Sequence, residues 1–222
     1  MGGTGIGMAK TARDPEERIR ERNRRIILKA GIEVFSRKGF DGTRIAEIAE
    51  KSGLPKANVY YYFSSKEEIY TAIIAHLIKS WDEALKPITA DSEPAEAFRN
   101  YVYAKLDYTR RNAAESRLFA SEIIHGARFL KKKDREHMRL ITDERVEVVE
   151  SWIAAGKMVP VDPRHLFITL WAATQFYADF EPLASDALHA SRLRASDYEQ
   201  AAETITSTIL NGILVRPEKS IA

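Results

Sequence analysis

Residues 43–63 have the sequence TRIAEIAEKSGLPKANVYYYF, in which two short helical patterns stand on either side of a glycine. Apolar residues at helical spacing predict one helix over 44–51, with Thr43 as its N-cap. Gly53 allows the left-handed backbone of a tight turn, and a second short helix is expected over 56–62. Two short helices joined in this way form a helix-turn-helix.

The residue types of this segment also indicate what it binds. Ala49 is small enough for the two helices to pack closely, and the second helix then presents short or polar side chains to base edges in the major groove. Asn58 is able to form two hydrogen bonds with an adenine, and lysines near it neutralise phosphates. On these grounds the candidate DNA-contacting residues are Lys56, Ala57, Asn58, Tyr60, Tyr61 and Lys66.

Charge is unevenly distributed along the chain. Residues 1–66 hold 14 Lys and Arg against 8 Asp and Glu, whereas the remainder holds 20 against 24. A basic first third is expected where one end of a protein meets a polyanion. A solvated charged surface would give the same count, so charge alone leaves both interpretations open.

Helical patterns separated by short breaks account for the rest of the sequence. The first helix is expected over 16–38, with Gly39 as its C-cap residue, and Ser65 and Glu68 form a capping box that opens a long helix to about residue 85. No segment alternates convincingly enough for a strand, so the fold class is all-α. The further helices are expected at 95–111, 114–130, 134–155, 163–180 and 197–213.

Composition excludes several classes of protein. The chain has 222 residues, of which 45% are hydrophobic and 30% charged, the balance of a soluble globular protein with a core. No apolar run approaches the roughly 18 residues of a membrane-spanning helix, and the first ten residues lack the apolar run of a signal peptide. The absence of cysteine removes disulfides, thiolate metal sites and cysteine catalysis. A cytoplasmic protein is expected.

Residues 39–70, GFDGTRIAEIAEKSGLPKANVYYYFSSKEEIY, resemble the DNA-binding domain of the TetR family of transcriptional repressors. The family's G-(F/Y)-x-x-T-x-(V/I)-x-x-I-A start and Y-x-(Y/H)-F-x-x-K-(E/D)-x-L/I finish are both present. The resemblance implies that Thr43, beside Arg44, caps the first motif helix and contacts phosphate, and that Lys66 binds phosphate. Pro55 departs from the family pattern, because many members have a capping serine there.

The same resemblance implies an architecture and partners. It implies a homodimer on a palindromic operator, with a three-helix DNA-binding domain at 16–64, a helical ligand-binding and dimerisation domain at 65–216, and no cofactor. The helices at 163–180 and 197–213 would pair across the two-fold axis through faces that include Ala201, Ile205 and Ile209. A bound ligand would shift the long helix that begins at Ser65 and so change DNA binding.

The C-terminal half resembles the pyrimidine-utilisation regulators of that family in segments within 116–127 and 152–180, most distinctively in WAATQFYADF at 171–180. This implies a pyrimidine base such as uracil or thymine as effector, and control of pyrimidine or nitrogen metabolism genes. A planar base needs an aromatic surface and an amide or carboxylate. The candidate ligand-binding residues are therefore Trp171, Gln175 and Asp179, which share one helix face, and Trp81, which is placed to close the pocket.

Other interpretations of these residues stay open. Trp171 at helical spacing also suits a core or dimer contact, Asp179 also suits a structural role, and a hydrophobic or acyl-CoA effector would not need Gln175. Glu122 and His125 match half of a helical di-iron motif, which with His137 would suit a small metalloenzyme. No second Glu-x-x-His follows, so we expect neither a metal site nor an enzyme.

Overall fold

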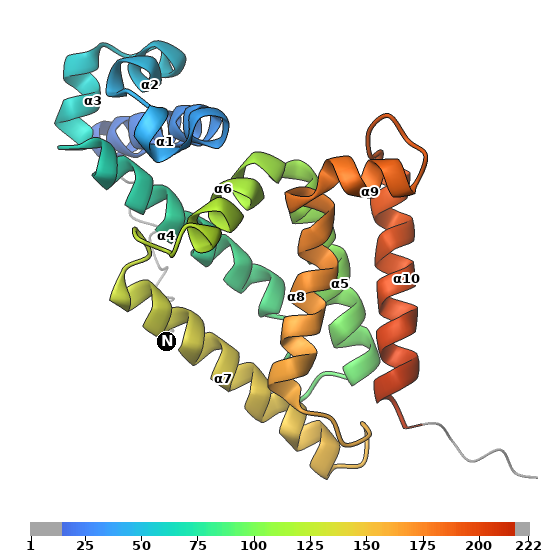
Figure 1. Ribbon diagram of the computed structural model, residues 1–222. Helices are drawn as coiled ribbons and strands as arrows, with labels where there is room; N and C mark the ends of the chain where they lie inside the picture. Colours follow the sequence, from blue (N-terminus) through green and yellow to red (C-terminus); the bar gives the residue numbers. More distant parts are fainter. Residues whose placement is uncertain (1–14, 216–222) are drawn as a thin grey trace, which may run out of the picture.

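The computed structural model describes residues 15–215, and within that range it contains ten helices and no β-strand, which confirms the all-α prediction (Figure 1). Helices α1 to α3 form a small head, and α4 leads from the head into a larger helical unit. The helices are α1 (Pro15–Gly42), α2 (Ile45–Ser52), α3 (Lys56–Tyr62), α4 (Lys66–Leu85), α5 (Pro94–Arg111), α6 (Ala113–Ile124), α7 (Lys132–Ala154), α8 (Pro163–Asp179), α9 (Glu181–Ala187) and α10 (Ala195–Ile213).

The junction between α1 and α2 differs from the prediction at its cap. Gly39 has φ 67° and ψ 178°, so α1 kinks there and continues for one short turn to Gly42 instead of ending. The N-cap of α2 is Arg44 and not Thr43, because the Thr43 hydroxyl donates back to the Gly39 carbonyl over 2.7 Å. The Glu47 carboxylate accepts from the Arg44 backbone N–H instead.

The predicted helix-turn-helix is present in α2 and α3. Gly53 ends α2 with φ 69°, and its N–H donates to the Glu50 carbonyl over 3.1 Å. Ile48, Ala49 and Val59 are buried between the helices, which fixes their relative orientation. Their burial leaves the opposite face of α3 toward solvent.

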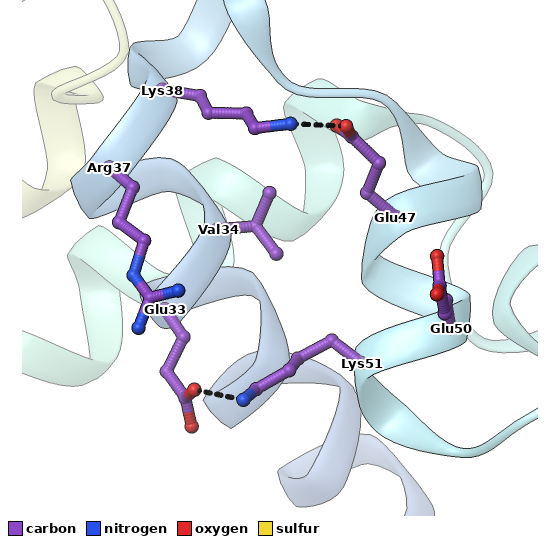
Figure 2. A pocket seen from close by; sticks show the side chains of 7 residues that line it. All are labelled: Glu33, Val34, Arg37, Lys38, Glu47, Glu50 and Lys51. Atoms are coloured by element: carbon purple, nitrogen blue, oxygen red, sulfur yellow. Dashed lines mark hydrogen bonds and ion pairs between the residues drawn. The ribbon is translucent and has the colours of Figure 1, made fainter.

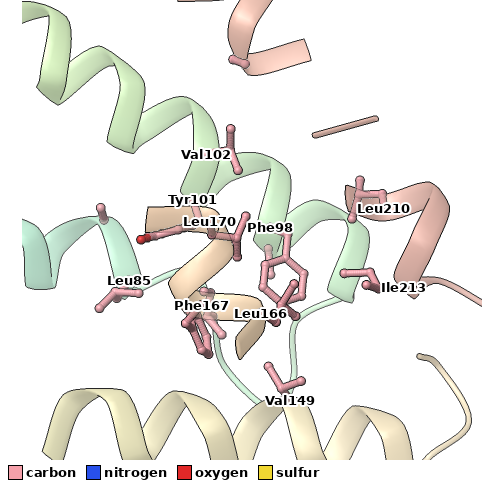
Figure 3. Close-up of a cluster of buried hydrophobic side chains, with 14 of the residues drawn as sticks. Leu85, Phe98, Tyr101, Val102, Val149, Leu166, Phe167, Leu170, Leu210 and Ile213 are labelled. Carbon is pink, nitrogen blue, oxygen red and sulfur yellow. The ribbon is translucent and has the colours of Figure 1, made fainter. Parts of the chain in front are cut away.

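Two hydrophobic clusters lie at either end of α4. One fills the head and includes residues of α6 and of the segment after it, such as Phe119 and Phe129. The other lies in the larger unit, where α5 packs against α8 and α10, and it contains Phe98, Trp152 and Phe167 (Figure 3). Because α4 contributes side chains to both clusters, it connects the head mechanically to the larger unit.

The helix boundaries in the C-terminal half required two corrections. Helix α6 ends at Ile124 and not at residue 130, because Gly126 and Ala127 adopt φ values of 91° and 55° and turn the chain toward the head. A short helix, α9, follows α8, so the two helices expected to be penultimate and last are not consecutive. Pro182 stands in the first turn of α9, where its missing N–H costs nothing.

Replacing Gly53 by alanine is expected to destabilise the protein by about 1 kcal/mol, because a Cβ disfavours the left-handed backbone. Gly212 offers a matched control, since it lies in a helix with nothing within 4 Å of an added Cβ. There alanine should be neutral or stabilising. Chemical denaturation of both variants measures the difference, and equal stabilities would contradict the role assigned to Gly53.

Candidate functional site

The exposed face of α3 carries most of the predicted DNA-contacting residues. Lys56, Ala57 and Asn58 stand exposed in its first turn, and the Tyr61 side chain is 76% exposed. The Lys56 ammonium lies 5.8 Å from the ring centre of Tyr60, which is also exposed. These side chains form one surface of mixed hydrogen-bonding and basic character, as a major-groove surface requires.

Two of the predicted phosphate-binding residues are engaged inside the head. Thr43 is only 2% exposed, and its hydroxyl already donates to Gly39. The Lys66 ammonium donates to the carbonyls of Phe40 and Thr43 over 2.7 and 3.0 Å. Neither side chain is free to bind phosphate without giving up these bonds, whereas Arg44 is exposed and free of them.

A surface hollow of about 450 Å³ lies between α1 and α2 (Figure 2). Its charged groups neutralise one another, since Lys38 pairs with Glu47 and Lys51 with Glu33 across the two helices. Exposed pairs of this kind contribute little stability, and they occupy both lysine ammonium groups of the hollow. Its lining is Glu33, Val34, Arg37, Lys38, Glu47, Glu50 and Lys51, with a single aliphatic side chain.

A buried lysine lies in the larger unit, where α4, α5 and α8 meet. Lys105 is 5% exposed, and its ammonium nitrogen lies 4.1 Å from the ring centre of Trp81. Burial lowers the pKa of Lys105 to about 7, against which the Asp179 carboxylate acts to raise it. A buried ammonium is unfavourable unless a hydrogen-bond partner or an opposite charge compensates for its lost hydration.

The predicted ligand-binding residues surround this lysine or adjoin it. Gln175 donates to the Asp179 carboxylate over 3.4 Å, and half-burial raises the pKa of Asp179, with Gln175 and Lys105 opposing the shift. Trp171 packs in the same cluster as Tyr101, which lies one helical turn before Lys105 on α5. Trp81 thus contacts Lys105, Asp179 interacts with it electrostatically and Gln175 bonds Asp179, while Trp171 packs on the core.

Lys105 was missed at the sequence level, although a signal for it exists. The buried face of α5 includes Phe98, Tyr101, Val102 and Leu106, and Lys105 falls on the same face at helical spacing. Because lysine is almost never fully buried unless it is paired, a lysine within an apolar stripe is a recognisable signal.

Several buried polar atoms on α4, α5 and α6 lack hydrogen-bond partners among the described residues. They are the indole nitrogen of Trp81 and the hydroxyls of Thr109 and Ser116. Thr109 lies one turn after Lys105 on α5, and Ser116 lies on α6. Unpaired buried donors cost about 1–3 kcal/mol each, so a polar ligand that bonds them is stabilised relative to an apolar one.

A second face of α8 points away from this site. Ile168, Phe176 and Phe180 are exposed at helical spacing, and the last two rings stack at 5.2 Å between centres. By contrast, Ala201 of α10 is buried in the core of its own chain, so it does not belong to a dimer surface as expected. Ile205 and Ile209 are half-buried against the same core. The exposed apolar stripe of α8 is therefore the stronger candidate for dimer contact.

The three residues of the metalloenzyme alternative each have another partner in the structure. Glu122 accepts a hydrogen bond from the Phe129 N–H, His125 bonds the Ser121 carbonyl, and His137 lies 2.7 Å from Asp82. Residues 15–215 contain no group of three or more side chains arranged to hold a metal ion. Over the same range no helix is long and apolar enough to span a bilayer.

A helix-turn-helix head joined by one long helix to a larger helical unit is the architecture of a DNA-binding regulator. Residues 27–73 match the family model for bacterial regulatory proteins of the tetR family, and residues 74–216 match the model for the C-terminal region of YcdC-like proteins. The chain belongs to the TetR family of transcriptional regulators. Because it is a regulator of this family, it is not an enzyme.

Named relatives and solved structures agree with this membership. The transcriptional regulator RutR of Escherichia coli is 35% identical over 193 residues, 87% of this chain and 91% of RutR. The transcriptional repressor NicS of Pseudomonas putida is 34% identical over 141 residues, 62% of this chain and 64% of NicS. AibR, solved with isovaleryl coenzyme A and operator DNA, has a TM-score of 0.63 at 20% identity over 84% of this chain and 97% of its own, and so shows the fold.

Replacing Lys105 by methionine is expected to stabilise the protein, because methionine fills a similar volume without a charge to desolvate. Between its folded pKa of about 7 and its ordinary value of 10.5, Lys105 binds fewer protons in the folded chain than in the unfolded one. Its unfavourable contribution is therefore full below pH 7 and is relieved as pH rises. We expect the variant to melt at least about 3 °C higher near pH 6, with a smaller gain near pH 9.

Differential scanning calorimetry at both pH values measures this gain. Lys79 on α4 is exposed, and its replacement by methionine is the matched control, with no pH-dependent gain expected. A Lys105→Met protein that melts lower than wild type near pH 6 would contradict a desolvated amine.

Proposed function

We propose that this protein is a repressor that senses a pyrimidine base such as uracil or thymine and controls genes of pyrimidine or nitrogen metabolism. The observation that supports this most directly is the group formed by Lys105, Gln175 and Asp179, bordered by Trp81 and Trp171. These three residues belong to α5 and α8 in the larger unit, whereas α3 lies in the head (Figure 1). The resemblance to pyrimidine-utilisation regulators supports the same effector class.

The chemistry of a pyrimidine base matches these side chains. Uracil and thymine carry alternating carbonyl and N–H groups on a planar ring. An ammonium donates to a carbonyl, a carboxylate or the oxygen of an amide accepts from an N–H, and an indole offers both a stacking face and a donor. Lys105, Asp179 and Trp81 supply one group of each kind.

An apolar effector fits the site less well. A hydrocarbon chain would leave Lys105 and Asp179 desolvated with no new partner, and the unpaired hydroxyl of Thr109 would stay unpaired. AibR, whose structure contains an acyl coenzyme A, shares the fold at 20% identity, which says nothing about the ligand of this chain. We therefore keep a hydrophobic or acyl-CoA effector as the second candidate only.

On this proposal, two protomers pair through the exposed face of α8 with α10 beside it, and each α3 enters one major groove of a palindromic operator. The effector acts through Trp81, because Trp81 lies on α4 and the first turn of that helix adjoins the head. A ligand that prefers one position of α4 changes the spacing of the two α3 helices. Coupling of this kind is typically worth about 1–3 kcal/mol.

Thymine or uracil should raise the melting temperature of the wild-type protein, and Gln175→Ala should remove that shift while leaving DNA binding intact. The expected reason is the loss of one hydrogen-bonding group to the base. A thermal-shift titration measures both, with Asn100→Ala, an exposed amide on α5, as matched control. An unchanged shift in Gln175→Ala would refute the pocket assignment, and a shift with acyl coenzyme A alone would favour the second candidate.

Two lysines of the head should behave differently toward DNA. Lys56→Gln should weaken binding to duplex DNA and reduce the slope of log K against log salt by about 0.9, as expected for one lost phosphate contact. Lys66→Gln should instead lower the melting temperature, because its ammonium holds the carbonyls of Phe40 and Thr43. Fluorescence anisotropy across a salt series and calorimetry separate the two effects. A slope unchanged in Lys56→Gln would contradict phosphate contact there.

A further inference from the structure

The carboxylate of Glu122 is buried at the junction between the larger unit and the head. The residue is 5% exposed, and its carboxylate accepts a hydrogen bond from the Phe129 N–H and interacts electrostatically with the Tyr70 hydroxyl. Burial and this carboxylate together raise the pKa of Tyr70. Glu122 lies on α6, Tyr70 on α4, and Phe129 in the segment after α6, so one side chain joins three parts of the chain.

These bonds place an aromatic side chain of the larger unit inside the core of the head. The ring of Phe129 lies 4.1 Å from that of Phe40 and 5.1 Å from that of Tyr70, centre to centre. The positive φ values of Gly126 and Ala127 direct the chain into this position. For alanine that backbone costs on the order of 1 kcal/mol, so the packing of Phe129 must offset it.

The Phe40 ring also contacts the Lys66 ammonium, which stabilises the backbone just before the helix-turn-helix. The Lys66 ammonium lies 4.4 Å from the ring centre of Phe40 and donates to the carbonyls of Phe40 and Thr43. The backbone of residues 40–43 leads directly into α2. A displacement of Phe129 is therefore transmitted to the helix-turn-helix through the Phe40 ring and the Lys66 ammonium.

The same buried face of α6 also adjoins the candidate effector site, because Phe119 lies one turn before Glu122. Phe119 packs edge-on against Trp81 with 4.5 Å between ring centres, and the unpaired hydroxyl of Ser116 belongs to the same helix. Helix α6 also packs against α8, which carries Gln175 and Asp179. A ligand that repositions Trp81 or α8 acts on α6 as well.

We infer that Glu122 and Phe129 form a wedge that transmits the effector signal from α6 to the head, in parallel with α4. With no effector bound, the Glu122 carboxylate holds Phe129 against Phe40 and fixes the turn at residues 40–43. Effector binding moves α6, withdraws Phe129 and lets the head reorient. The signalling role rests on the proposed function, which supplies the ligand. The contact between the wedge and the turn at residues 40–43 is independent of that proposal.

Phe129→Ala tests the wedge, because it removes the ring and leaves both binding sites in place. We expect the thymine-induced rise in melting temperature to persist, while the ratio of DNA dissociation constants with and without thymine falls from the roughly 5- to 150-fold of a coupled regulator to near 1. The DNA is a duplex selected from a random library with the wild-type protein. Ile124→Ala, with a side chain 72% exposed at the end of α6, is the control and should keep the wild-type ratio.

A second experiment needs no effector. Hydrogen exchange at the Thr43 amide, which donates to the Phe40 carbonyl, should quicken at least tenfold in Phe129→Ala and measurably in Glu122→Gln, which keeps the side-chain volume. Should Phe129→Ala fail to fold, Glu122→Gln supplies both readouts. If exchange quickens but thymine causes no thermal shift in wild type, the proposed effector fails and the wedge stands. Unchanged exchange, or a full thymine response in folded Phe129→Ala, would overturn the wedge.

Discussion

Enclosing the Lys105 side chain between α4, α5 and α8 carries a desolvation cost that its surroundings offset only in part. The Trp81 ring offers a cation–π surface and the Asp179 carboxylate an opposite charge, yet the pKa of Lys105 still lies near 7. A polar ligand that bonds this amine lowers the cost, which is the thermodynamic condition for selective binding. The buried amine therefore favours a polar effector over an apolar one.

Under the proposed function, the position of that site determines how the signal leaves it. Trp81 belongs to α4 and contacts Phe119 of α6, so a ligand beside Trp81 acts on both helices at once. Helix α4 reaches the head at Lys66, and α6 reaches it through Phe129. Both routes end at the turn before α2, whose carbonyls Lys66 holds. Because both routes converge on the same turn, a small change in the larger unit is able to reorient the helix-turn-helix as a rigid body.

How far the sequence predicted this structure depended on the range of the interactions concerned. Gly53 and the apolar positions around it act locally, so the helix-turn-helix was predicted correctly. The phosphate contact of Lys66 stays a prediction, whereas its bonds to Phe40 and Thr43 span more than 20 residues and leave no periodic pattern in the sequence. Ala201 was assigned to the dimer surface because small residues suit both a core and an interface. Helical spacing places Lys105 on the apolar face of its helix, yet it was not predicted as a site residue.

The most direct test of the account is the ionisation of Lys105 itself, followed by NMR of its side-chain nitrogen in protein with labelled lysine. The account predicts an amine that titrates at about 7 in the free protein and whose resonance and pKa change on adding thymine but not on adding a hydrocarbon ligand. An amine that titrates near the ordinary value of 10.5 would contradict a desolvated site. A titration near 7 that thymine leaves unchanged would contradict the assignment of the effector to that site.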